Sequence, residues 1–204
     1  MVEIPRLYAI VDSAAFSGTA QVCAYAEELL AGRVTLLQYR NKNGSARVML
    51  EQARALKMVV DGRARLIMND RADLCLAAEF DGLHVGQDDL LPESARRMIG
   101  KERWLGVSTH NPEQLREADL TSADYLAVGP VFWTMSKENP DPVVGLEGVR
   151  RARELTTKPL VGIGGITREN ARLVLDAGAD AVAVISDLRS EPRKSAEEFF
   201  QILG

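Results

Sequence analysis

Three short polar stretches, each directly after an apolar run, contain the residues of this chain that are best suited to chemistry. They are Gln38-Tyr39-Arg40-Asn41-Lys42, Asn69-Asp70 and Gly86-Gln87-Asp88-Asp89. Carboxylate oxygens bind hard cations such as Mg²⁺, whereas Arg and Lys side chains neutralise phosphate charge. Together the three stretches indicate a site for magnesium and a polyphosphate.

The spacing within these stretches favours a shared site. Gln38, Arg40 and Lys42 alternate, so a strand that continues through them directs all three side chains to one side. Asp70 and Asp89 can each give one oxygen to a Mg²⁺ that keeps waters and binds phosphate. Two alternatives stay open here, because Lys42 alone fits a solvated loop and Asp70 fits the N-cap of a following helix.

The charge balance makes the basic residues of the first stretch more informative. The chain has 204 residues, a formal net charge of −4 and a pI near 5.4. This balance provides no basic footprint for nucleic acid or for an anionic membrane surface. An anionic ligand therefore needs a local cluster of cations, which Arg40 and Lys42 can form.

Eight apolar runs of strand length alternate with eight segments of helical periodicity. The predicted strands are Leu7–Val11, Val34–Tyr39, Arg65–Met68, Gly82–Val85, Trp104–Val107, Tyr125–Val128, Leu160–Ile163 and Ala181–Ile185. The predicted helices are Ala20–Leu30, Ala46–Val60, Arg71–Ala78, Glu93–Ile99, Pro112–Ala118, Leu146–Leu155, Arg168–Ala177 and Ser195–Leu203. Strict alternation of strands that are apolar on both faces predicts a parallel sheet covered by helices.

Eight such units predict an α/β protein with a single-domain (β/α)₈ TIM barrel over residues 1–204. The alternative, an open doubly wound sheet, usually carries a glycine-rich fingerprint after its first strand, but this chain reads Asp12-Ser13-Ala14 there. Thr167 is a candidate N-cap and Gly178 a candidate stop for the seventh helix. The irregular, proline-containing stretch 135–145 is predicted to be a mobile active-site loop.

Two cysteines, Cys23 and Cys75, lie in helical segments without metal-ligand spacing, which predicts reduced core thiols. The first residues lack the pattern of a signal peptide, and no apolar run is long enough to cross a bilayer. We therefore expect a cytoplasmic protein.

The remaining strand ends complete the predicted barrel mouth. The fifth predicted strand is followed by Ser108, Thr109 and His110, while His84 within the fourth is expected to be a packed, hydrogen-bonded residue. A phosphate clamp is predicted from the polar side chains after the sixth strand, and a glycine-lined phosphate site from the ends of the last two strands. These residues are Thr134, Ser136, Lys137, Gly164, Gly165 and Ser186. Two anion sites at one barrel mouth indicate two anionic substrates.

Across nearly its whole length the chain resembles thiamine phosphate synthase. The resemblance rests on QYRNK (38–42), NDRADLCLAAEFDGLHVGQDD (69–89), GVSTH (106–110), GPVFWTMSK (129–137), GLEG (145–148), GIGGI (162–166) and VIS (184–186). It implies a barrel enzyme that joins 4-amino-2-methyl-5-hydroxymethylpyrimidine diphosphate to 4-methyl-5-(2-phosphoethyl)thiazole, giving thiamine phosphate and pyrophosphate with Mg²⁺ as cofactor. Whether copies of the chain form a homo-oligomer is left open.

The resemblance also implies roles for individual residues. The residues implied to hold the pyrimidine diphosphate are Gln38, Tyr39, Arg40, Asn41, Lys42, Asn69, Ser108 and Lys137. Those implied to hold the thiazole phosphate are Thr134, Met135, Ser136, Gly165, Ile185 and Ser186. Asp70 and Asp89 are implied to bind Mg²⁺, and the residues implied to act in catalysis are Arg40, Lys42, Ser108 and Lys137.

The implied reaction is a dissociative substitution, in which diphosphate leaves before the thiazole nitrogen attacks. This chemistry needs no protein nucleophile, and the sequence offers no nucleophile–base pair. Two positions depart from the family pattern, since Asn41 replaces an acidic residue and Ser136 replaces threonine. The alternatives are a thiazole tautomerase that uses His110 as a proton shuttle, a sugar-phosphate isomerase or epimerase, and a regulatory barrel that only binds thiazole phosphate.

Overall fold

Strands and helices alternate along the chain as the sequence predicts. The computed structural model describes residues 2–134 and 141–204. The strands are β1 (Leu7–Asp12), β2 (Leu36–Arg40), β3 (Arg65–Asn69), β4 (Gly82–Val85), β5 (Trp104–Thr109), β6 (Tyr125–Val128), β7 (Leu160–Ile163) and β8 (Ala181–Val184). The α-helices are α1 (Thr19–Ala31), α2 (Ala46–Val60), α3 (Ala72–Ala77), α4 (Pro92–Ile99), α5 (Pro112–Asp119), α6 (Gly145–Leu155), α7 (Ala171–Asp176) and α8 (Pro192–Leu203). Two 3₁₀ turns, η1 (Ser13–Ala15) and η2 (Ser186–Leu188), follow β1 and β8.

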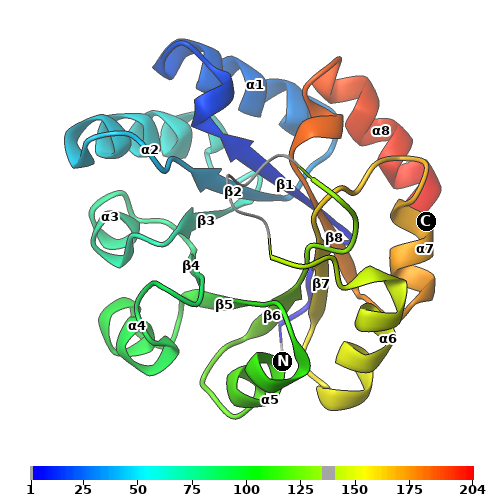
Figure 1. Ribbon diagram of the computed structural model, residues 1–204. Helices are drawn as coiled ribbons and strands as arrows, with labels where there is room; N and C mark the ends of the chain where they lie inside the picture. The colour runs from blue at the N-terminus through cyan, green and yellow to red at the C-terminus, as the bar shows by residue number, and fades with distance from the viewer. Residues whose placement is uncertain (1, 135–140) are drawn as a thin grey trace.

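All neighbouring strands pair in parallel, and β1 pairs with both β2 and β8, which closes the sheet. The helices form a ring outside the strands (Figure 1). The predicted (β/α)₈ barrel is therefore confirmed. Closure satisfies the edge groups that an open sheet leaves unpaired, and it brings all eight strand ends to one mouth.

Two hydrophobic clusters cover the two faces of the closed sheet. The inner cluster contains residues such as Tyr8, Ile67 and Tyr125, which fill the barrel. The outer cluster, between strands and helices, includes Leu37 and Leu66. Because side chains alternate along a strand, neighbouring residues belong to different clusters. This alternation decides which polar residues at the strand ends face the mouth.

Element boundaries agree with the sequence predictions to within a few residues, and Pro92 and Pro112 lie in the first turns of α4 and α5, where a missing N–H costs little. The seventh helix is the clearest exception, because it begins at Ala171 and Thr167 does not cap it. Instead the Thr167 N–H donates to Asn170 Oδ1 at 2.8 Å, and a turn precedes the helix. Gly178 follows the end of this helix with a φ of 111°, as a glycine stop requires.

The two cysteines are free thiols in different surroundings. Cys75 is buried, which raises its pKa to about 12. Cys23 is only half-buried, so its placement in the core was wrong. Among the described residues, no helix combines the length and apolar character that a membrane crossing needs.

Candidate active site

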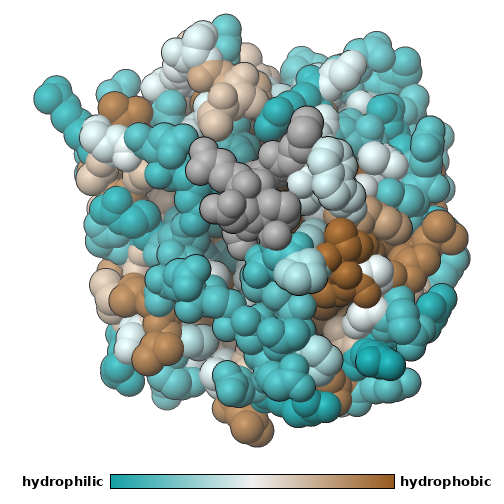
Figure 2. Space-filling model, viewed as in Figure 1, coloured by the Kyte–Doolittle hydropathy of each residue, from teal (hydrophilic) through white to brown (hydrophobic). Residues whose placement is uncertain are grey.

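A cavity of about 420 Å³ lies at the carboxyl ends of the barrel strands. It brings together most of the predicted site residues. Those that line it are Gln38, Arg40, Lys42, Asn69, Asp70, Asp89, Ser108, Thr134, Gly165, Ile185 and Ser186. Three further predicted residues, Met135, Ser136 and Lys137, lie outside the described residues, as does most of the predicted 135–145 loop. The surface around the mouth is mostly hydrophilic (Figure 2).

Tyr39 and Asn41 do not line this cavity. Tyr39 has the outward phase of β2, and its hydroxyl donates to Gln52 Oε1 on α2 at 2.5 Å. Asn41 Nδ2 donates to the same oxygen at 3.1 Å, while its Oδ1 accepts the Gly44 N–H at 2.7 Å. These two residues therefore anchor the loop after β2 to α2, and Arg40 and Lys42 on either side of Asn41 are held at the mouth.

Each basic residue of the first stretch is paired with a carboxylate. Arg40 Nη1 lies 2.6 Å from Asp12 Oδ2, and Lys42 forms an ion pair with Asp70. Asp12 was not among the site residues predicted from the sequence. The signal lies in its position, because Asp12 ends β1 and is the register partner of Arg40 on β2. Both side chains of the Arg40–Asp12 pair are largely shielded from solvent, with exposed fractions of 18% and 6%.

Asp70 and Asp89 lie side by side, as the predicted metal site requires. Asp70 is not a helix cap, because α3 begins at Ala72 after Arg71. Its backbone is left-handed, with a φ of 61°, and its N–H donates to the His84 carbonyl at 2.8 Å. Burial, and then the hydrogen bond and charge of Asp70, raise the pKa of Asp89.

This pair suits a divalent cation because two adjacent carboxylates repel each other, and the single positive charge of Lys42 beside them balances only one of the two negative charges. The described residues contain no cluster of three or more His, Cys, Asp or Glu side chains that could hold a metal. Magnesium tolerates this, since it usually binds one or two carboxylates and takes its other oxygens from water and substrate phosphates. The two carboxylates and nearby Lys42 therefore fit a Mg²⁺–phosphate complex better than a metal held by protein alone.

An uncharged hydrogen-bond chain forms the floor of the cavity. Gln38 Nε2 donates to the Tyr8 hydroxyl at 2.8 Å, which lies 3.0 Å from the Tyr125 hydroxyl. The Tyr125 hydroxyl lies 3.0 Å from His84 Nδ1, and His84 Nε2 lies 2.8 Å from Ser108 Oγ. His84 is thus packed and hydrogen-bonded as predicted. Tyr8 and Tyr125 were not predicted from the sequence, although both are polar aromatic residues at inward positions of their strands.

The three central residues of this chain stay uncharged. Burial lowers the pKa of His84 to about 4 and raises the pKa values of Tyr8 and Tyr125. Each tyrosine therefore keeps its one O–H donor, and the imidazole keeps a single N–H.

Gly106 is the residue whose small size allows Tyr125 and His84 to meet. A Cβ at this position would lie 2.1 Å from Tyr125 Cζ and 2.4 Å from His84 Nδ1. We expect Gly106→Ala to destabilise the protein by roughly 1–3 kcal/mol, because both rings are enclosed and must shift. Urea unfolding measures this, with Gly18→Ala as a control, since a Cβ at Gly18 meets nothing within 4 Å. A loss for Gly106→Ala no greater than that of the control would contradict the packing argument.

His110 joins two segments at the edge of the cavity. Its Nδ1 lies 2.6 Å from the Gly129 carbonyl, and its Nε2 lies 3.5 Å from Asp141 Oδ2. Its backbone N–H donates to Gln114 Oε1 at 2.8 Å in α5. His110 therefore lines the cavity and also leads into α5.

The opposite side of the cavity is lined by backbone. Gly165 has a φ of 64°, and a Cβ there would lie 2.5 Å from the Trp133 carbonyl oxygen. A glycine therefore lets this loop pack closely against Phe132 and Trp133, while Gly164 and Gly165 line the cavity. Ser186 begins η2 directly after β8 and also lines the cavity. The mouth thus has a charged side near β2 to β4 and a glycine-lined side near β7 and β8.

Comparison with known proteins assigns this barrel to a family. Residues 7–188 match the family described as thiamine monophosphate synthase. The chain belongs to this family. A thiamine-phosphate synthase of Koribacter versatilis is 60% identical over 204 residues, which cover 98% of this chain and 97% of that protein. One from Chloroflexus aurantiacus is 43% identical over 182 residues, covering 89% and 83%.

A solved structure agrees with this assignment. The thiamine phosphate pyrophosphorylase of Pyrococcus furiosus has a TM-score of 0.86 to this chain at 35% identity, with 97% of this chain and 95% of that one covered. The predicted membership in the thiamine monophosphate synthase family is confirmed. The roles of individual residues remain predictions. The cavity lining agrees with those of Gln38, Arg40 and Lys42 but not with those of Tyr39 and Asn41.

Proposed function

We propose that this chain is a thiamine phosphate synthase, which joins a 4-aminopyrimidine methyl diphosphate to a thiazole phosphate and releases pyrophosphate. Its family membership bears out the predicted enzyme class, a transferase. The observation that carries the proposal is the placement of Arg40 and Lys42 beside the Asp70–Asp89 carboxylate pair in one cavity. The proposal includes a cytoplasmic setting, where Cys23 and Cys75 stay reduced.

The charged side of the cavity is suited to the leaving group. Asp70 and Asp89 would hold Mg²⁺, which when bound supplies charge neutralisation for the diphosphate. Arg40 and Lys42 donate charge-assisted hydrogen bonds to phosphate oxygens from the same side. Binding diphosphate there gives Lys42 a second anionic partner besides Asp70, so the cation does not have to leave its carboxylate.

The opposite side is suited to the second substrate. The Gly165 backbone and Ser186 would bind the phosphate of the thiazole, as the last two strand ends do in many barrels of this kind. The thiazole nitrogen is then held over the same mouth as the pyrimidine methylene. Holding two reactants in line can lower a barrier by several kcal/mol, without any covalent link to the protein.

The chemistry follows from this arrangement. The bond between the pyrimidine methylene carbon and the diphosphate oxygen breaks, and its electron pair leaves with the diphosphate. The 4-amino group donates electron density into the ring and stabilises the resulting cation. The thiazole nitrogen lone pair then forms the new carbon–nitrogen bond, so the protein only binds, orients and stabilises charge.

The test is an assay of the purified protein with both substrates, with and without Mg²⁺. We expect thiamine phosphate and pyrophosphate in equal amounts, and a large loss of rate when the metal is chelated. Absence of metal-dependent pyrophosphate release would overturn the proposal. In a parallel reaction, isomerisation of a thiazole carboxylate phosphate that depends on His110 but not on metal would identify the tautomerase alternative instead.

A further inference from the structure

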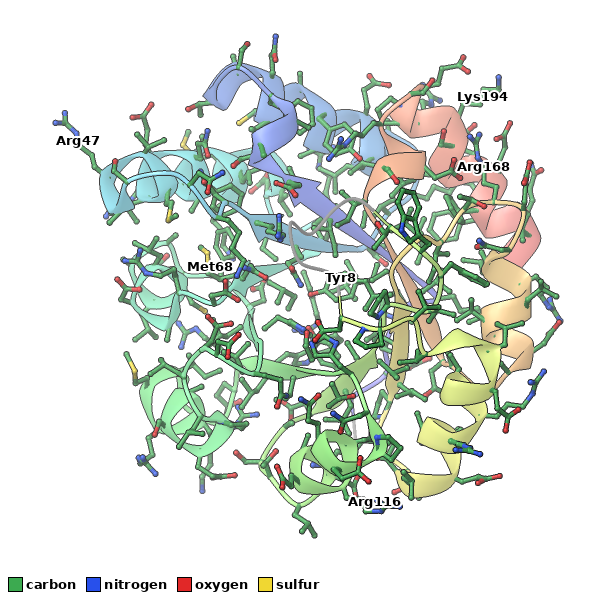
Figure 3. All side chains as sticks on the ribbon, viewed as in Figure 1. Tyr8, Arg47, Met68, Arg116, Arg168 and Lys194 are labelled. Atoms are coloured by element: carbon green, nitrogen blue, oxygen red, sulfur yellow. The ribbon has the colours of Figure 1, made fainter. Side chains whose placement is uncertain are left out.

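The uncharged chain on the cavity floor connects two residues that face the substrate through three that do not act on it in the proposal. Gln38 and Ser108 are the two ends of this chain, with Tyr8, Tyr125 and His84 between them, and all of these residues except Tyr125 line the cavity. Tyr8 lies near the centre of the ring of strands (Figure 3). Tyr125 is fully buried, and His84 and Gln38 are 7% and 3% exposed. With so little water present, protein groups must satisfy each other's hydrogen bonds.

Such a chain has a direction, because each hydroxyl has one proton and a neutral imidazole has one N–H. Gln38 Nε2 donates to the Tyr8 hydroxyl, and Tyr125 is the other hydrogen-bond partner of that hydroxyl among the described residues, so the arrangement that uses every donor directs the Tyr8 proton to the Tyr125 oxygen. The Tyr125 proton is then directed to His84 Nδ1, which leaves the imidazole proton on Nε2. That N–H donates to Ser108 Oγ. The Ser108 hydroxyl proton consequently remains available to the cavity.

The direction also decides what Gln38 offers. Gln38 Nε2 uses one of its two N–H groups to donate to Tyr8, which fixes the orientation of the amide and leaves its carbonyl oxygen able to accept from a ligand. The two ends of the chain are therefore opposite in character, an acceptor at Gln38 and a donor at Ser108. Reversing one link would require reversing all of them, since a single mismatch would place two donors or two lone pairs against each other in a buried site.

We propose that Tyr8, Tyr125 and His84 are positioning residues that set the hydrogen-bond polarity of Gln38 and Ser108 and thereby select an aminopyrimidine. The inference rests on the proposed function for the substrate class. An amino group next to an unprotonated ring nitrogen offers one donor and one acceptor, which complement the Gln38 carbonyl and the Ser108 hydroxyl. A 4-oxo ring carries the opposite pattern, with a carbonyl next to an N–H, and meets two repulsive contacts.

The same polarity assists the reaction. As diphosphate leaves, positive charge spreads onto the amino group, whose N–H bonds become stronger donors. A fixed acceptor at Gln38 therefore binds the transition state more tightly than the ground state, which raises kcat rather than only lowering KM. A positioning effect of this kind is expected mainly in kcat.

The first measurement reads the direction of the chain without turnover. The protein contains only two histidines, His84 and His110, so nitrogen-15 NMR of histidine-labelled protein resolves each ring. We expect His84 to carry its proton on Nε2, and the signal of this N–H to be protected from exchange with water. In Tyr125→Phe we expect the ratio of the Nε2-protonated to the Nδ1-protonated tautomer of His84 to change. A wild-type His84 protonated on Nδ1 overturns the inference, even if the enzyme makes thiamine phosphate.

The second measurement is kinetic. Tyr125→Phe keeps the ring that packs against Tyr8 and His84 and removes only the hydroxyl that joins them. We expect kcat to fall by about 10-fold, the cost of one hydrogen bond of about 1.4 kcal/mol, with KM for the thiazole phosphate unchanged. The 4-oxo analogue of the pyrimidine diphosphate is expected to inhibit the wild type weakly. In the variant, the affinity for this analogue is expected to rise relative to the affinity for the 4-amino substrate.

Tyr8→Phe breaks the chain at its other tyrosine and serves as a second variant if Tyr125→Phe does not fold. Tyr25→Phe is the matched control, because the Tyr25 hydroxyl is buried without a hydrogen-bond partner among the described residues. The control is expected to keep wild-type kcat and stability. Unchanged kcat and unchanged discrimination against the 4-oxo analogue in both chain variants would overturn the inference, while metal-dependent synthesis by the wild type keeps the proposed function.

Discussion

Replacing Arg40 with glutamine is expected to lower kcat/KM by about 100-fold or more and to destabilise the protein by about 3 kcal/mol. The loss of rate follows from the removal of a cation that stabilises the leaving diphosphate. The loss of stability has a different cause, because the Asp12 carboxylate is buried and lies 2.6 Å from Arg40 Nη1. Without Arg40 this carboxylate remains buried and has lost the cation that pairs with it. Steady-state kinetics and urea unfolding measure the two losses separately.

A second substitution separates these causes. In the double variant Arg40→Gln/Asp12→Asn the buried charge is removed together with its partner, so most of the lost stability is expected to return. The rate is expected to remain low, because the cation is still missing from the cavity. If the double variant recovered activity along with stability, Arg40 would have a structural role and no part in binding diphosphate.

Replacing Asp89 with asparagine is expected to remove most of the response to Mg²⁺ and to lower the rate by about 100-fold or more. Burial and the neighbouring Asp70 raise the pKa of Asp89, which means that its ionised form is disfavoured in the folded protein. A raised carboxyl pKa costs stability as pH rises through the folded pKa, so without metal the neutral asparagine is at least as stable as aspartate at pH 7. The variant thus loses function without losing its fold.

Thermal unfolding with and without Mg²⁺ and pyrophosphate tests this directly. A ligand that binds only the folded state raises Tm, so the wild type is expected to gain stability and Asp89→Asn to gain much less. Asp176→Asn on α7 is the control. The Asp176 carboxylate is half exposed, pairs with Arg172 one turn earlier on the same helix, and does not line the cavity. An equal rise in Tm for wild type and Asp89→Asn would show that the metal binds elsewhere.

The barrel itself was predictable because its signals are local. Each strand is an apolar run buried on both faces, and each helix has its own periodicity, so the alternation is readable without knowing any contact. The error at the seventh helix has a local cause too. Thr167 is a residue type that often caps helices. Here its N–H donates to Asn170 Oδ1 within a turn, and the helix begins only after Asn170, at Ala171.

The site was predictable where alternation along a strand decided it. Gln38, Arg40 and Lys42 share one phase of β2 and its extension, and all three line the cavity. Family resemblance alone also included Tyr39 and Asn41, which have the other phase and bond to Gln52 in α2. Physical periodicity and resemblance therefore disagreed at these two positions, and the structure places both side chains behind the strand.

The sequence by itself determined the order of the elements, the inward phase of the polar residues and the types of group at the strand ends, because these depend on neighbours along the chain. Only the tertiary structure decided which groups meet. Asp12 lies 28 residues from Arg40, and Tyr8 lies 117 residues from Tyr125. Strand register brings Asp12 to Arg40, and barrel closure brings Tyr8 to Tyr125. Neither feature can be deduced from the residues next to these positions in the chain. The Arg40–Asp12 ion pair therefore depends on the register of β1 and β2, and the hydrogen bond between Tyr8 and Tyr125 depends on the closure of the sheet into a barrel.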